Sequence, residues 1–336
     1  TQQQLVGDAA RAMLDSGIGA VVLCVNPQGP DVEAEVRAAA DAALATGIRA
    51  AVVYPVADLT AEHAGRSRRA AGWPAGRVAA ELAAFERVVA DYPQPTLDVQ
   101  LGPVGPQWVS ESTLHVIAEY ATAHARRLHM HLLESPAQRR WADETYPEGL
   151  LRWLDGAGLL TERTWIAHGT HLRDDELDLL AGRGCGLTLN ASSNLRLASG
   201  IAPVHRADRR VPRLALGLDG LALNDDHDVW TELRLARGIW QAQAHEAIDG
   251  ACLLRLASER GSGALGPAAS PPLLVGGRAD LLLVSLVGLA APLARKDWTL
   301  ADVLVAAARP GRVRQTWIDG WRVGGLDAAG GSEGAQ

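Results

Sequence analysis

The sequence predicts an α/β protein folded as a (β/α)-barrel of the TIM type and followed by a small β-rich appendage. Short apolar segments alternate with segments of helical periodicity through most of the chain, which is typical of a parallel sheet. These segments are near-continuous hydrophobic runs, as expected of strands covered on both faces. A length of 336 residues suits a barrel with an appendage. We expect the barrel at 1–265, the appendage at 266–325 and a disordered Gly/Ala-rich tail at 326–336.

Seven strand–helix units follow from this periodicity and fit a nearly complete barrel. The expected strands are 20–26, 49–54, 96–101, 128–133, 164–168, 186–190 and 213–218. The expected helices are 1–18, 32–46, 76–91, 111–126, 136–158, 173–182, 228–243 and 246–258. We expect the first of these strands to be buried and residues 191–196 to form a polar loop.

The character of the chain changes after about residue 266. Residues 271–275 and 279–285 have the pattern of short β elements, and 298–309 has that of a helix. Residues 313–323 predict a hairpin that turns at Asp319-Gly320.

Composition excludes several classes of function. The formal net charge of −7 and the absence of a basic run argue against a nucleic-acid surface. No apolar run reaches the length of a membrane span, and no signal peptide is visible. The three cysteines, Cys24, Cys185 and Cys252, lack the spacing of a disulfide framework or a thiolate zinc site. A reducing cytoplasm is therefore the expected compartment.

Potential catalytic groups follow several strands at their C-terminal ends. His131 and Glu134 end the strand at 128–133, His168 ends the next, and Asn190 and Asp219 end the two after that. Active sites of (β/α)-barrels lie at this end of the strands. A histidine that binds a metal, with a carboxylate that carries protons, is a workable arrangement for metal-assisted hydrolysis. The recurrence on separate strands is the main argument for an enzyme.

Other polar residues near these strand ends leave their roles open. Gln107 and Trp108 follow the strand at 96–101 and are candidates for substrate binding, although Trp108 equally suits packing of the loop on the barrel. Ser193 and Asn194 are candidates for substrate contact or for ordering their loop. His129 lies on the same strand face as His131, and a packing or supporting role is favoured for it.

The cluster Asn224-Asp-Asp-His-Asp228 suits either a helix start or the surroundings of a substrate.

With these segments in order, the chain resembles the amidohydrolase superfamily, in the branch of cytosine and guanine deaminases and triazine (chloro)hydrolases. The matching motifs are His131-Leu-Leu-Glu134, Ile166-Ala-His-Gly169, Ser193-Asn-Leu-Arg-Leu-Ala-Ser-Gly-Ile-Ala-Pro203, Leu216-Gly-Leu-Asp-Gly220, Gly277-Arg-Ala-Asp-Leu281 and Trp317-Ile-Asp-Gly320.

The resemblance implies a metal-dependent (β/α)8 barrel with a small β-sandwich built from both chain ends. It makes His131 a metal ligand, Glu134 the general acid and base, and His168 a proton relay or an additional metal-facing residue. It makes Asp219 a metal ligand that helps to deprotonate the nucleophilic water. The implied cofactor is one divalent ion, Zn²⁺ first, with Fe²⁺ or Mn²⁺ as alternatives. Bound zinc lowers the pKa of water to about 7.

The implied reaction is deamination of an aminated heterocycle, such as a pyrimidine, purine, pterin or triazine, by attack of metal-bound hydroxide. One alternative is hydrolytic removal of another leaving group, an alkylamine or chloride, from a similar ring. The other is an inactive barrel that lacks a complete metal site. The expected partner is a small heterocyclic substrate, and family analogy also implies self-association.

Two segments depart from the family pattern. The family's first strand carries His-x-His, whereas the earliest strand here ends in Cys24-Val-Asn26 and matches the family's second strand. We expect residues upstream of Thr1 to supply the first strand and the N-terminal half of the sandwich. In addition, Asn190-Ala-Ser-Ser-Asn194 stands where relatives often have Cys-Pro before Ser-Asn.

Overall fold

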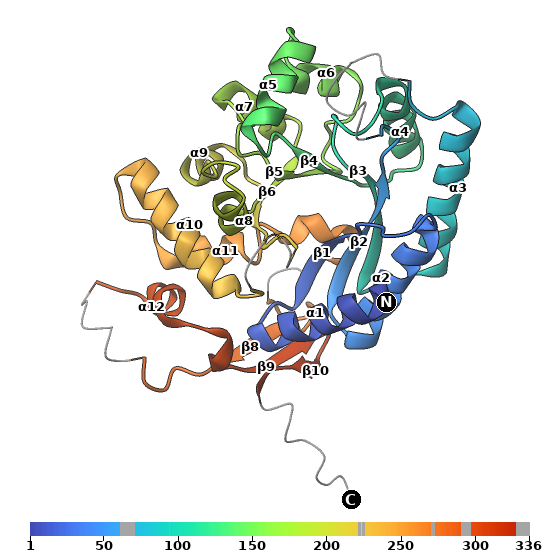
Figure 1. Cartoon of the computed structure of the whole chain (residues 1–336). Coiled ribbons are helices and arrows are strands. Elements are labelled where there is room, and N and C mark those ends of the chain that lie inside the picture. Colours follow the sequence, from blue (N-terminus) through green and yellow to red (C-terminus); the bar gives the residue numbers. More distant parts are fainter. Residues whose placement is uncertain are drawn as a thin grey trace, which may run out of the picture.

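The protein is a curled parallel sheet surrounded by helices, with a small second sheet beside it (Figure 1). This computed structural model describes residues 1–60, 71–93, 95–220, 223, 226–269, 273–289 and 297–326. Asn224-Asp225, Pro271-Pro272 and the expected tail from 327 onward lie outside the described residues. The seven strands of the large sheet follow one another in chain order, β1 to β7, all in parallel pairs. The predicted α/β barrel architecture is confirmed.

The strands lie close to their predicted positions. Those of the large sheet are β1 (Ala20–Cys24), β2 (Arg49–Val56), β3 (Leu97–Pro103), β4 (Leu128–Leu132), β5 (Thr164–His168), β6 (Gly186–Leu189) and β7 (Leu214–Leu216). Those of the small antiparallel sheet are β8 (Leu281–Val284), β9 (Val313–Ile318) and β10 (Trp321–Gly324), in the order β10-β9-β8.

The helices alternate with the strands as expected. They are α1 (Gln2–Ser16), α2 (Val32–Thr46), α3 (Ala75–Asp91), α4 (Glu111–Ala123), α5 (Pro136–Thr145), α6 (Leu150–Gly156), α7 (Asp174–Gly182), α8 (Ala191–Arg196), α9 (Val204–Arg210), α10 (Val229–Ala244), α11 (Gly250–Leu256) and α12 (Leu300–Ala307). Two 3₁₀ segments, η1 (Ser262–Ala268) and η3 (Pro310–Arg312), complete the described elements.

The expectation that the first strand is buried was wrong. Ala20 and Cys24 are exposed, and the three residues between them are only half-buried. The reason is that β1 pairs with β2 alone, so it forms one edge of the sheet while β7 forms the other. Strand β2, which pairs on both sides, is buried over nearly its whole length.

Three further expectations require correction. The stretch at 136–158 is two helices, because Pro147 and Gly149, whose φ is +100°, interrupt it. Residues 191–196 form helix α8 rather than a polar loop, because Ser193 and Asn194 turn inward and are fully buried. Residues 273–275 are not a strand, and all three side chains are exposed.

Most of the core is one large apolar cluster between the sheet and its helices, and two small clusters lie where η1 packs against the strands. Met130, Ile166 and Leu187, on successive strands, are completely buried within the large cluster.

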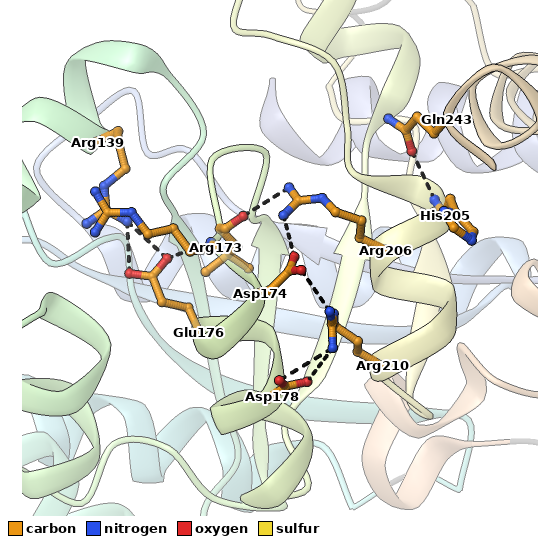
Figure 2. Close-up of polar contacts among 10 residues, drawn as sticks. Arg139, Arg173, Asp174, Glu176, Asp178, His205, Arg206, Arg210 and Gln243 are labelled. Carbon is orange, nitrogen blue, oxygen red and sulfur yellow. Dashed lines mark hydrogen bonds and ion pairs between the residues drawn. The ribbon is translucent and has the colours of Figure 1, made fainter. Parts of the chain in front are cut away.

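Outside the sheet, ion pairs join α5, α7 and α9. Arg139 pairs with Glu176, and Arg206 and Arg210 both pair with Asp174 (Figure 2). Among the described residues, no helix is both long and apolar enough to cross a membrane.

The small sheet is joined to the barrel through α1 and Arg49. Helix α1 packs against β9 and β10, and Thr316 donates a hydrogen bond to the carbonyl of Leu14 at 2.7 Å (Figure 1). The guanidinium of Arg49, at the start of β2, is completely buried and pairs with Asp280 at 2.7 Å and Asp319 at 2.9 Å. The predicted hairpin at 313–323 is present as β9 and β10, turning at Asp319-Gly320.

Candidate active site

Three non-glycine residues at or just after the C-terminal ends of β4, β5 and β7 have a left-handed backbone conformation. Leu133 has a φ of +49°, His168 of +70° and Asp219 of +64°. Such conformations cost about 1–3 kcal/mol each and cluster at functional sites. Leu133 directly precedes Glu134, and Asp219 follows β7 by three residues. The backbone is therefore strained at the strand ends that carry three of the predicted residues.

His131 is fixed by a hydrogen bond to the backbone. Its Nδ1 lies 3.0 Å from the carbonyl oxygen of Val104. A carbonyl can only accept, so Nδ1 carries the hydrogen and the lone pair of Nε2 is available. Metal-binding histidines are commonly oriented in this way. The ring of His131 lies 5.4 Å, centroid to centroid, from that of His168 on the neighbouring strand.

Glu134 lies beside His168, with its Oε2 3.9 Å from Nε2 of that ring. Its backbone N–H donates to the Gln138 side chain at 2.7 Å. Burial, followed by the negative charge of Asp219, raises the pKa of the Glu134 carboxyl above its ordinary value. A carboxyl group shifted in this direction is better suited to donate a proton near neutral pH than an exposed one.

His168 is buried and receives two amide donors. The side-chain nitrogens of Asn190 and Asn194 each lie 3.2 Å from Nδ1. With Nδ1 as acceptor, the hydrogen of the neutral ring is on Nε2, which faces Glu134. Burial, and then the neighbouring His131, lower the pKa of His168 to about 4. The ring is therefore neutral at pH 7, and its contact with Glu134 is not an ion pair.

Asp219 is held by the residues around it. Its Oδ2 accepts a hydrogen bond from the Ser193 hydroxyl at 2.6 Å, and Oδ1 accepts from the Gly220 N–H at 2.8 Å. Asp219 and His131 both influence the pKa values of Glu134 and His168. The four residues predicted for chemistry thus share one electrostatic environment.

The residues predicted to bind substrate fall into two groups. Gln107 is nearly buried, with its side-chain amide beside Gly105, whereas the Trp108 side chain is exposed. Ser193 and Asn194 are fully buried and bonded to Asp219 and His168. These two have a supporting position, and their contact with substrate stays a prediction.

Two further histidines lie on or just after these strands. His129 is buried, and burial, followed by the charges of His131 and His168, lowers its pKa to about 3. His171 lies in the turn after β5, where its Nε2 is 2.6 Å from the carbonyl oxygen of Ser199. Of the cluster at 224–228, Asp228 caps helix α10 by accepting from the Trp230 N–H.

Sequence reasoning did not assign two residues that support this arrangement. Asn190 was recognised only as a strand-end residue, yet its amide contacts His168. Glu232 was not singled out, although it is buried and accepts hydrogen bonds from the start of α8. A signal existed: Glu232 falls on the apolar face of its helix, beside Leu233 and Ala236, where a carboxylate must find internal partners.

The described residues contribute only part of a metal-ligand set. Among them, no group of three or more His, Cys, Asp or Glu side chains is arranged to hold an ion. His131, with its Nε2 lone pair free, and Asp219, with its carboxylate held by Ser193 and Gly220, do offer donor atoms of the type that zinc accepts. The chemistry of these two groups fits a metal.

Comparison with known proteins decides the family. The model of the amidohydrolase family matches residues 3–323. The chain belongs to the amidohydrolase family. Amidohydrolases similar to it in sequence include the 8-oxoguanine deaminase of Pseudomonas aeruginosa, 34% identical over 257 residues, which are 74% of this chain and 57% of that protein. The 5-methylthioadenosine/S-adenosylhomocysteine deaminase of Haloarcula marismortui is 32% identical over 63% of this chain and 49% of that protein. The chain thus spans about half the length of the curated relatives it matches.

Solved amidohydrolase structures superpose on most of the chain. An adenosine deaminase from Xanthomonas campestris with bound zinc has a TM-score of 0.77 at 26% identity, covering 95% of this chain and 70% of that one. The atrazine chlorohydrolase of Arthrobacter aurescens TC1, complexed with zinc, has a TM-score of 0.78 at 20% identity, covering 96% and 72%. The second likeness shows the fold alone. The resemblance found in the sequence motifs is confirmed.

Proposed function

We propose that this amidohydrolase removes an amino group from an aminated heterocycle, such as a purine, pyrimidine, pterin or triazine, by hydrolysis. The observation that carries the proposal is the convergence of His131, Glu134, His168 and Asp219 at the C-terminal ends of β4, β5 and β7. The relatives named as deaminases support the same reaction class. Ring deamination needs a group that activates water and a group that delivers a proton to nitrogen.

His131 and Asp219 are the residues that would hold a divalent ion, zinc in the first place, with iron(II) or manganese(II) as alternatives. The zinc bound in the adenosine deaminase from Xanthomonas campestris supports this choice. When bound, such an ion supplies Lewis acidity that activates water for hydrolysis. The Nδ1–H···O=C bond of His131 and the Ser193–Asp219 bond orient the two donor groups before any ion arrives.

Glu134 carries the proton in this proposal. Its raised pKa keeps a protonated fraction available nearer neutral pH than an ordinary glutamic acid would. In the proposed step the carboxylate takes one proton from water and passes it to the ring nitrogen, while the hydroxide adds to the carbon that bears the amino group. It then takes the proton of the new hydroxyl and passes it to the amino group, so that the C–N bond breaks, ammonia leaves and a carbonyl remains on the ring. His168 stays neutral and holds its Nε2–H beside Glu134, where it can donate a hydrogen bond to an oxygen anion that develops in the reaction.

Gln107 and Trp108 are the proposed substrate contacts, since they follow β3 on the side of the barrel where His131 lies. The exposed indole of Trp108 offers a flat apolar face to a heterocycle.

Residues 266–325 are proposed to be an appendage outside the site. A reducing cytoplasm is proposed as the compartment because all three cysteines are free.

Ammonia release from a panel of aminated heterocycles tests the proposal. The panel contains purines, pyrimidines, pterins and triazines, with Glu134→Gln as the matched inactive variant. We expect ammonia from at least one ring with the wild-type protein and release at least about a hundredfold slower with the variant. Release of an alkylamine or chloride instead, measured on the corresponding triazines, would identify the alternative leaving group.

A further inference from the structure

The loop between β6 and α8 contains an unusual arrangement at the start of a helix. Asn190 is the residue that precedes α8, and asparagine in that position normally accepts a hydrogen bond from the helix with its own side chain. Here Asn190 makes no such bond. Its amide nitrogen points to His168 Nδ1 at 3.2 Å, and its Oδ1 is buried without a partner among the described residues.

Glu232 accepts the hydrogen bonds that Asn190 leaves open. From helix α10, its Oε1 accepts from the backbone N–H of Ala191 at 2.7 Å and of Ser192 at 3.3 Å. Glu232 is 1% exposed, so these N–H groups compensate part of the cost of burying its carboxylate. The first turn of α8 is thus capped by a side chain that is 40 residues away in sequence.

The capped helix carries the groups that hold the proposed active site. Ser193 donates to Asp219, and Asn194 donates to His168 Nδ1 alongside Asn190. Three side chains from one segment of five residues therefore fix both His168 and Asp219. If this segment shifts, both site residues lose hydrogen-bond partners together.

We propose that Glu232 is a positioning residue for the site: by capping α8 it frees Asn190 to hold His168. The inference rests on the proposed function only for its effect on turnover. Its structural content concerns His168, Asn190 and Glu232 themselves. Without the Glu232 carboxylate, the Asn190 side chain should turn to cap its own helix and leave the imidazole.

The experiment follows the ring nitrogens of His168 by NMR in protein labelled with ¹⁵N-histidine, with His168→Gln to assign its signals. In the wild type, we expect an Nδ1 signal shifted by the donors it accepts. In Glu232→Ala, we expect this signal to move toward that of an imidazole nitrogen without a donor. Glu232→Gln, which keeps one side-chain oxygen for Ala191, should restore most of the wild-type position.

Two further variants make the result specific. Glu176→Ala is the matched control, because Glu176 also binds a backbone N–H at a helix start, that of Arg173, but belongs to the outer ion-pair network (Figure 2). It should lower stability and leave the His168 signals in place. Asn190→Ala should shift them in the wild-type background and have little further effect in Glu232→Ala.

Turnover provides a separate measurement. Glu232→Ala should reduce kcat about tenfold, which corresponds to about 1.4 kcal/mol in the barrier, with little change in KM.

A folded Glu232→Ala protein whose His168 signals match the wild type would overturn the proposal. If that variant does not fold, Glu232→Asp, which withdraws the carboxylate by one methylene group, must shift the signals or the proposal fails. Absence of ammonia release from the wild type would instead count against the proposed function and leave the NMR result valid.

Discussion

The hydroxyl of Ser193 donates a hydrogen bond of 2.6 Å to the carboxylate of Asp219, which joins helix α8 to the residue after β7. Ser193 is fully buried, and Asp219 has a left-handed backbone with a φ of +64°. One hydrogen bond to a charged group contributes about 1.5–3 kcal/mol. This bond therefore offsets a substantial part of the strain at Asp219 and sets the direction of its carboxylate.

Ser193→Ala should lower kcat/KM for the heterocyclic substrate by about 10- to 100-fold, because Asp219 loses the hydrogen-bond donor that orients its carboxylate. Steady-state ammonia release measures the effect. Ser258→Ala, which removes an exposed hydroxyl bonded only to a helix carbonyl, is the control and should leave the rate unchanged. Equal rates for the two variants would show that the Ser193–Asp219 bond has no role in turnover.

Glu134→Gln should lower kcat by about 10²- to 10⁴-fold, because the amide cannot carry a proton between water and the ring. The fold should persist, since the Glu134 side chain is partly exposed and its backbone bond to Gln138 is unaffected. Circular dichroism and the melting temperature check the fold. Retention of more than a tenth of the wild-type kcat would exclude Glu134 as the proton carrier.

Stability should fall as the pH is lowered from 6.5 toward 4. The pKa of His129 is lowered to about 3 and that of His168 to about 4, both below the ordinary value of 6.5. Between these values the unfolded chain binds protons that the folded protein does not, so the free energy of unfolding decreases with decreasing pH. The loss should reach about 2 kcal/mol for each histidine at pH 5 relative to pH 8.

Urea unfolding between pH 8 and pH 5 measures this slope. His129→Asn should flatten it by about half, because one of the two buried histidines no longer titrates. The control is His245→Asn, at an exposed position whose left-handed backbone asparagine tolerates. An unchanged slope in His129→Asn would mean that His129 is not held neutral by the fold.

Asp280→Ala should destabilise the protein by about 3–5 kcal/mol, because it removes one partner of a buried charge. The Arg49 side chain is completely buried, whereas Asp280 and Asp319 keep some contact with solvent. Arg49→Met should therefore cost less than Asp280→Ala, since the two carboxylates it leaves behind can be hydrated. Denaturant unfolding of both variants checks the order, and the reverse order would contradict it.

The sequence predicted the strands and the strand-end residues well, because both depend on local patterns. Apolar runs such as 128–133 and 164–168 strongly favour buried strands. Parallel strands in a barrel bring their C-terminal ends together. The incorrect predictions concern residues whose structure is determined by tertiary contacts. Helix α8 was predicted as a loop because Ser193 and Asn194 are polar, and only the folded protein supplies Asp219 and His168 as their partners.

The exposure of β1 and the partners of Glu232 could not be predicted from the local sequence either. An apolar strand has the same sequence pattern at the edge and in the middle of a sheet, so the half-exposed state of β1 followed only from its single neighbour. Glu232 lies about 40 residues from the backbone groups it binds. A buried carboxylate on an apolar helix face indicates some internal partner, but not which one.

The most direct test of the central claim is ammonia release from the heterocycle panel by the protein produced from its complete reading frame, compared with His131→Ala, Glu134→Gln and Asp219→Ala. We predict turnover of at least one aminated ring by the wild type and loss of at least a hundredfold in each folded variant. Turnover above a tenth of the wild-type rate in any of these three variants would contradict the claim that these side chains form one hydrolytic site.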